Sequence, residues 1–450
     1  EQRSMPQTWT LTATRLAAAL CLWLMAALPL QAQSIIRAAE LERGLRELAA
    51  PILAQAGLPR SIRIIVINDQ RLNAFVADAR HIFIHSGLLM RMEDPAELQA
   101  VLAHEAAHIA NGHFATRATN ARNAGRGAGF GLLLALAAAS AGSGEAAVGL
   151  AMGTQSAAQR NYLAHTRAEE AAAAQSALRN MIEAGIDPPA MSRVLDLFRG
   201  QEALSAGRQD PYIRSHPLTR DRVRAVEAFA IGRGGNVIGA EPTLEASYWF
   251  ARTTGKLSAF LQNPRQTLRQ VRGRDDEISI MRRAIALHRA ARSDEALTAM
   301  ARLLALRPSD PFYTELRAQI LFESRDFAAA AQAYGQAVAL APREPQILAG
   351  HGRALLALDT SSSNSSALSV LQEAYARDPL DPRMLRDLAL AYARGGQNGQ
   401  ASAVTAERYA LLRQFDTAAV HARRAIGLLP QGSPGYRRSQ DSLAAAGSGN

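Results

Sequence analysis

Residues 94–108 read DPAELQAVLAHEAAH, and this stretch decides how the first half of the chain is organised. Asp94 can cap a helix, Pro95 suits a first helical turn, and Glu97 can close a capping box. A helix is therefore predicted to begin here and to continue to about residue 120. Its centre carries a pattern that is rare by chance and that has a definite chemistry.

That pattern is H-E-x-x-H. Because residues four apart lie on one helical face, His104 and His108 can present two imidazoles to a single Zn²⁺ ion. Glu105 lies beside them, where it can deprotonate a metal-bound water without being a ligand. Composition predicts about 0.01 chance occurrences of the motif in this chain, so the pattern indicates a zinc hydrolase. His113, nine positions after His104, is predicted to lie on the opposite face as a structural or surface residue.

A catalytic zinc usually has three protein ligands and one open position. Glu169, Glu170 and His165 are candidates for the third ligand, because a long alanine-rich helix is predicted over about 160–184. Spacing alone leaves the choice between the two glutamates open. The single cysteine, Cys21, lies in a segment predicted to be removed, so histidines and carboxylates must hold any metal.

The sequence before the motif predicts a helix and a small sheet. Residues 61–67 (SIRIIVI) and 81–85 (HIFIH) are β-rich, and 73–75 (NAF) are a strand or strand end between them. An edge strand near 81–85 is expected to hold an extended peptide by β-addition. A helix is predicted over 34–58 because four aliphatic residues fall on one face. These are Leu41, Leu45, Leu48 and Ile52.

The N-terminal residues predict export. An apolar run of fifteen residues, Leu16–Leu30, follows Arg15, and cleavage after Ala32 makes residues 1–32 a signal peptide. An uncleaved membrane anchor is the alternative, although the run is shorter than the roughly 20 residues that span a bilayer. Residues 128–153 are rich in glycine and alanine and are predicted to form a buried or lid helix rather than a membrane segment.

The composition excludes one class of function. The net charge is +10, but Lys256 is the only lysine and the arginines are spread along the chain. No basic run with interleaved aromatic residues is present, so binding of nucleic acid is not expected. Attraction to anionic membrane surfaces or to acidic partners stays open.

From about residue 276 the sequence indicates paired helices. Prolines and alanines recur at a spacing of 34, which is the period of tetratricopeptide repeats (TPR). The recurring pairs are Pro308 with Pro342 and Ala296 with Ala330. TPR-like repeats are predicted over 276–450, with 231–275 as a linker and connecting helices and the serine-rich stretch 360–366 as a loop. A generic helical bundle is the alternative.

Together these residues resemble the HtpX- and BepA-like zinc metallopeptidases, a family that includes the CAAX prenyl proteases. The order and spacing are similar to the periplasmic branch, which carries C-terminal TPR repeats. The expected fold class is α+β, mostly α: a zincin-like metalloprotease domain over 33–230 with a small sheet, followed by an α-helical TPR solenoid. The matching segments are, in chain order, 73–75 (NAF), 84–89 (IHSGLL), 97–98 (EL), 104–109 (HEAAHI), 184–188 (AGIDP) and 215–222 (SHPLTRDR).

The resemblance also implies roles for residues outside the motif. Residues 167–170 (RAEE) match the first half of the family pattern R-x-x-E-x-x-x-D, which makes Glu170 the third ligand. The aspartate of that pattern is replaced by Ala174, and an aspartate there would orient a ligating histidine. His216 would either fill the fourth metal position at rest or donate to the tetrahedral intermediate. Arg222 would support the same oxyanion.

The function that the resemblance implies is an exported zinc endopeptidase of the gluzincin type, with one Zn²⁺ per chain and Glu105 as general base. It would serve quality control of envelope and outer-membrane proteins in the periplasm, with peripheral membrane contact. Its partners would be misfolded or assembling envelope proteins and, through the TPR region, the outer-membrane assembly machinery. The alternatives are a TPR chaperone-like binding module with a weak or regulatory zinc site, and an inner-membrane protease anchored by residues 16–30 and 128–153.

Overall fold

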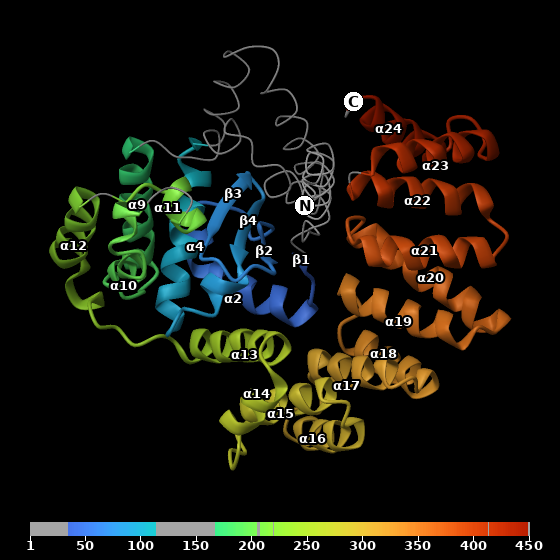
Figure 1. The fold of residues 1–450 in the computed structure, drawn as a ribbon, viewed down its shortest axis with the longest axis horizontal. Helices are drawn as coiled ribbons and strands as arrows, with labels where there is room; N and C mark the ends of the chain where they lie inside the picture. The colour runs from blue at the N-terminus through green and yellow to red at the C-terminus, as the bar shows by residue number, and fades with distance from the viewer. Residues whose placement is uncertain (1–34, 114–166, 205–207, 219, 413, 449–450) are drawn as a thin grey trace, which may run out of the picture. The chain divides into compact units, whose positions relative to one another are not determined.

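The computed structural model describes residues 35–113, 167–204, 208–218, 220–412 and 414–448. The predicted signal peptide, the 128–153 segment and the candidate ligand His165 lie outside these ranges. The described part is mostly helical and contains one small mixed sheet, which confirms the predicted fold class (Figure 1). No helix in the described ranges is long and apolar enough to cross a membrane.

A four-stranded sheet lies in the N-terminal part, in the order β1 (Ile35–Ile36), β2 (Arg63–Ile67), β4 (His81–His85), β3 (Ala74–Asp78). β2 and β4 are parallel, and the other two pairs are antiparallel. Two expectations are wrong here. The predicted first helix begins late, because residues 35–36 pair with β2. The strand at 81–85 is not an edge strand: it pairs on both sides and is buried throughout, and β3 is an edge strand among the described residues.

Two helices cover this sheet. α2 (Ala39–Gln55) buries its predicted apolar face, and α4 (Pro95–Ala110) packs against α2 and the strands. The predicted start of α4 is confirmed, because the Asp94 side chain accepts from the backbone N–H of Glu97 at 3.0 Å. The capping box does not close, since Glu97 accepts from the N–H of Glu93 instead. α4 also ends at Ala110, well before residue 120.

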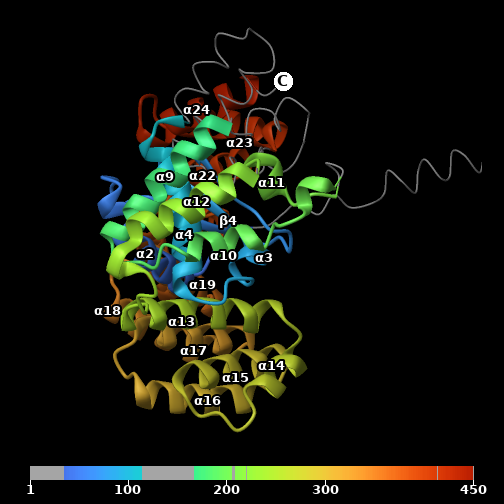
Figure 2. The same cartoon turned by 90° about the vertical axis from the view of Figure 1, so that its left-hand side faces the viewer.

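Further helices complete one hydrophobic core with the sheet. α9 (Arg167–Glu183) packs along α4, and α12 (Arg220–Gly234) packs on α9 (Figure 2). The short elements of this part are α3 (Ser86–Leu89), α10 (Ala190–Asp196), η1 (Gln201–Ala203), α11 (Pro211–Ser215) and η2 (Gly235–Val237). The helix α9 matters most for the site, because it places a carboxylate opposite the histidines of α4.

After residue 243 the described chain is helical. From residue 277 onward each helix packs mainly on its neighbours in sequence, as in a solenoid of helical repeats. The predicted TPR-like solenoid is thereby confirmed. One detail is wrong: residues 360–366 form no loop, because Thr360 caps α20 in a capping box with Ser363. The helices are α13 (Leu244–Leu261), α14 (Pro264–Gln270), α15 (Glu277–Arg289), α16 (Ser293–Leu306), α17 (Pro311–Glu323), α18 (Phe327–Leu340), α19 (Pro345–Leu358), α20 (Ser361–Arg377), α21 (Pro382–Arg394), α22 (Asn398–Leu411), α23 (Phe415–Leu428) and α24 (Pro434–Ser448).

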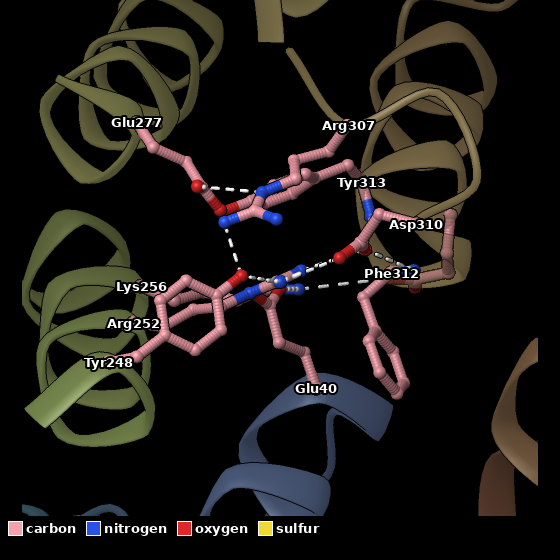
Figure 3. Close-up of polar contacts among 10 residues, drawn as sticks. Glu40, Tyr248, Arg252, Lys256, Glu277, Arg307, Asp310, Phe312 and Tyr313 are labelled. Atoms are coloured by element: carbon pink, nitrogen blue, oxygen red, sulfur yellow. Dashed lines mark hydrogen bonds and ion pairs between the residues drawn. The ribbon is translucent and has the colours of Figure 1, made fainter. Parts of the chain in front are cut away.

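A buried ionic cluster joins α2 to α13 and to the first repeat helices (Figure 3). Arg252 of α13 pairs with Glu40 of α2, and it binds both carboxylate oxygens of Asp310 at 2.6 and 2.8 Å. Its guanidinium lies 3.8 Å from the ring centroid of Tyr313. Lys256, the single lysine, donates to Glu40 at 2.7 Å. These contacts tie the N-terminal part to the start of the repeats through charges removed from water.

Glu344, the residue before α19, lines a pocket together with Glu42 of α2. Burial and the Glu42 carboxylate raise the pKa of Glu344 from 4.5 to about 7. Because this pKa is higher in the folded state, the free energy of unfolding should fall as pH rises from about 4.5 through 7. Glu344→Gln is expected to raise the free energy of unfolding by about 1–2 kcal/mol at pH 8 and to leave it nearly unchanged at pH 4. Urea denaturation at the two pH values measures this, and an equal effect at both would contradict it.

Candidate metal centre

α4 carries three side chains of the H-E-x-x-H motif into the interior. His104, Glu105 and His108 have no solvent exposure, because this helix is buried on all sides from Pro95 to His108. The two histidines lie one turn apart, and their Nε2 atoms are 3.1 Å from each other. The helical geometry expected from the sequence therefore brings both imidazoles to one point.

α9 brings Glu170 to the same point. One carboxylate oxygen lies 3.3 Å from Nε2 of His104, and the other lies 3.3 Å from Nε2 of His108. Glu169, the other glutamate that spacing had left open, is only partly buried and does not belong to this group. The packing of α9 on α4 thus selects one of two adjacent glutamates.

His216 reaches the group from the end of α11. Its Nδ1 lies 2.9 Å from Glu170 Oε1, and its Nε2 lies 3.5 Å from Glu105 Oε1 and 3.3 Å from the carbonyl oxygen of Ala74 in β3. The ring packs on Tyr212, with the centroids 4.6 Å apart. Donor atoms of four residues lie within 4.8 Å of one another. They are His104, His108, Glu170 and His216.

Arg222 of α12 contacts the ligand group directly. Its Nη1 lies 2.7 Å from Glu170 Oε2, and its Nη2 lies 3.4 Å from Nε2 of His104. Burial would raise the pKa of Glu170, but His216, Arg222 and His104 outweigh burial and hold this pKa well below its ordinary value. Burial lowers the pKa of His104 to about 4. The site therefore combines an ionised carboxylate with neutral imidazole, which are the forms that bind a metal ion.

These residues fit a zinc ion. In a tetrahedral site with Zn–N and Zn–O bonds of about 2.0–2.1 Å, neighbouring ligand atoms lie about 3.4 Å apart. The two imidazole nitrogens of His104 and His108 are 3.1 Å apart, and each lies 3.3 Å from a different oxygen of the Glu170 carboxylate. Two imidazoles and one carboxylate also form one of the ligand sets that zinc hydrolases use.

The expected position of His113 on the opposite face is wrong, because this residue contacts His108, although it does not belong to the group of donor atoms. α4 ends at Ala110, and Gly112 adopts a positive φ of 69°. The chain turns back, and Nδ1 of buried His113 comes within 3.0 Å of Nδ1 of His108. Counting positions around a helix is valid only while the helix continues. The pair Asn111-Gly112 was the signal, since glycine commonly follows a helix end in this conformation.

Residues 36–230 match the sequence profile of peptidase family M48. This chain carries a peptidase family M48 domain. The resemblance to HtpX- and BepA-like peptidases is thereby confirmed, and the M48 domain contains the whole group of donor atoms described above.

The chain is also similar to beta-barrel assembly-enhancing proteases. The protein of Yersinia pestis is 25% identical over 375 residues, which are 82% of this chain and 74% of that protein. The protein of Escherichia coli K12 is 24% identical over 261 residues, which are 57% and 52% of the two chains. A relative from Vibrio cholerae is 26% identical over 222 residues, 44% of each chain. The chain thus spans about half the length of two of these three relatives.

Two solved structures resemble part of the chain. A thermophilic TPR protein of Thermus thermophilus is 23% identical, with a TM-score of 0.27, and covers 38% of this chain and 100% of its own. MamA of Desulfovibrio magneticus RS-1 is 18% identical, with a TM-score of 0.32, and covers 36% and 94%. Both likenesses extend over little more than a third of the chain.

Ala174 stands at the position where the resemblance implies an aspartate. This residue lies one turn after Glu170 on α9 and is buried. The buried Nδ1 of His104 has no hydrogen-bond partner among the described residues. A ligating histidine usually donates this proton to an acceptor that fixes the orientation of its ring. The resemblance implies that an aspartate at position 174 would supply such an acceptor.

Ala174→Asp is expected to tighten zinc binding or to raise turnover by about 10–100-fold, because it supplies an acceptor for His104. Ala174→Asn is the matched control, since it adds similar volume without the charge. Competition with a chromophoric chelator measures zinc affinity, and peptide hydrolysis measures turnover. If both quantities stay the same or fall in the aspartate variant, the absence of an acceptor does not limit this site.

Proposed function

We propose that this protein is a zinc-dependent endopeptidase with one zinc ion per chain. The observation that carries the proposal is the convergence of His104, His108 and Glu170, from two packed helices of an M48 domain, on one buried point. These three residues would hold the metal. When bound there, zinc would supply Lewis acidity, which polarises a peptide carbonyl and lowers the pKa of water toward about 7.

The residues around this point support a division of roles. Glu105 lies next to His104 on α4 and is completely buried. It would take a proton from the attacking water and return it to the leaving amine. Arg222 neutralises Glu170 and would stabilise negative charge that develops on the carbonyl oxygen. β3, an edge strand of the sheet as far as the described residues go, would hold an extended substrate, because the carbonyl of its Ala74 faces His216.

The names of the relatives and the repeats support a role in the envelope. We place the protein in the periplasm, where it would act on misfolded or assembling outer-membrane proteins. The repeat helices would bind these substrates or the assembly machinery, since solenoids present extended surfaces suited to proteins. A second candidate, a chaperone-like binding protein with a weak zinc site, is favoured by one observation: His104 has no acceptor for its Nδ1 proton among the described residues.

Zinc content and casein hydrolysis of the purified protein separate the two candidates. The peptidase is expected to contain about one zinc per chain and to lose hydrolysis when a chelator removes it. A protein that contains no zinc, or that binds zinc and unfolded casein without cleaving it, would contradict the proposed peptidase and support the binding protein.

His216 is the residue whose substitution distinguishes a gate from a proton donor. Its nitrogen belongs to the group of four donor atoms, which supports a resting state that this imidazole closes. His216→Ala is therefore expected to raise casein hydrolysis or self-cleavage several-fold. A donor in the transition state would instead give a lower kcat with little change in KM. Wild-type kinetics on both counts would refute both roles.

A further inference from the structure

His113 contacts the Nδ1 edge of the His108 ring, which points away from the other proposed ligands. The two Nδ1 atoms are 3.0 Å apart, and the ring centroids are 5.1 Å apart with an interplanar angle of 67°. Nε2 of His108 faces His104 and Glu170, at 3.1 and 3.3 Å. The nitrogen that meets His113 is therefore the one that a metal ion would not use.

The contact between two imidazoles determines where the protons are. A neutral imidazole carries one N–H and one lone pair, and an N···N distance of 3.0 Å requires an N–H opposite a lone pair. A metal ion takes the lone pair of Nε2 in His108, so the proton of that ring must be on Nδ1. This proton is donated to the lone pair on Nδ1 of His113, whose own proton is then on Nε2.

We propose that His113 is a positioning residue of the metal site, which accepts the Nδ1 proton of His108 and so fixes the tautomer and orientation in which His108 binds zinc. The inference rests on the proposed function, because it takes His108 as a zinc ligand. In metal sites a carboxylate, a backbone carbonyl or a water usually fills this role. Here a neutral imidazole fills it, and the turn at Gly112 brings that imidazole into place.

The contrast between the two histidines of the motif makes His113 important. Nδ1 of His104 has no acceptor among the described residues, whereas Nδ1 of His108 has one. A neighbouring side chain, His113, therefore fixes the ring orientation of His108, whereas no described residue does this through Nδ1 of His104. Loss of such a partner typically costs about 10–100-fold in metal affinity, and we expect an effect of this size when His113 is removed.

Three variants of the full-length protein test the inference. His113→Asn keeps an acceptor, because the amide oxygen of asparagine lies about where Nδ1 lies in histidine. His113→Gln moves the acceptor one bond further out, and His113→Leu removes it at similar volume. Zinc affinity is measured by competition with a chromophoric chelator. The absorption spectrum of the Co²⁺-substituted protein reports ligand geometry, and thermal unfolding of the metal-free forms reports stability.

The leucine variant is expected to lose about 10–100-fold in zinc affinity and to change the Co²⁺ spectrum. The asparagine variant should stay within about threefold of the wild type, and glutamine should bind more weakly than asparagine. If leucine binds zinc as the wild type does, the inference is wrong and the proposed zinc site stands. If asparagine and glutamine lose affinity equally, in step with metal-free stability, His113 has only a structural role. A wild-type protein that binds no zinc would overturn the proposed function together with the inference.

Discussion

Glu105→Gln is expected to keep zinc at the wild-type stoichiometry and to lose peptide hydrolysis by about 10²–10⁴-fold, the range that a general base contributes. The three proposed ligands remain, and glutamine has nearly the shape of glutamate, so the buried site keeps its packing. What disappears is the carboxylate that takes the proton from water. Metal analysis and casein hydrolysis, made on the same preparation, measure the two quantities.

Glu97→Gln is the matched control, because it makes the same chemical change on the same helix. Glu97 lies near the start of α4, where it accepts from the N–H of Glu93 and pairs with Arg193. This variant should retain hydrolysis. If Glu105→Gln still cleaves casein in an assay free of contaminating metalloproteases, Glu105 is not the general base.

Arg252→Leu is expected to lower the free energy of unfolding by about 3–5 kcal/mol, because Asp310 loses the guanidinium that pairs with its carboxylate. Glu40 keeps Lys256 as a partner but loses its contact with the guanidinium. The loss also includes the packing of the guanidinium on the ring of Tyr313. Urea denaturation followed by circular dichroism measures the change.

Arg307→Leu is the control for the same cluster. Arg307 pairs with Glu277 at 2.9 Å, but its side chain is 51% exposed, so this pair should contribute no more than about 1 kcal/mol. Similar losses for both arginines would contradict the argument from burial. The Arg252→Leu variant has a second readout. If the Arg252→Leu protein folds, cleaves short peptides normally and cleaves large substrates poorly, the buried ionic cluster positions the repeats for substrate recognition.

The cluster affects how the repeats can be tested. A chain cut after residue 275 is expected to keep zinc and to cleave short peptides, yet to lose large or assembling substrates. The cut also removes Asp310 and Tyr313 from Arg252 and uncovers the part of α13 that packs on α15. Substitution at Arg252 in the intact chain therefore separates recognition from folding more cleanly than truncation does.

The sequence by itself determined the features that depend on neighbours along the chain. Capping by Asp94 and the proline at 95 fix the start of α4, and the spacing of four places His104 and His108 on one face. The 34-residue period predicted the repeats, because each repeat packs mainly on the next one. These features follow from local backbone preference and from the geometry of a helix, so sequence distance predicts spatial distance.

The tertiary structure decided the features that depend on contacts between distant segments. Spacing could not choose between Glu169 and Glu170, and only the packing of α9 on α4 does so in space. The pairing of β4 on both sides follows from the parallel pairing of β2 with β4, which places β4 between β2 and β3. Arg252 and Glu40 meet across 212 residues, and neither has a sequence signal for the other. Such contacts form because the burial of apolar surface packs whole helices and strands against one another. Which polar side chains then meet depends on the packing of all these elements, and not on the sequence near either residue.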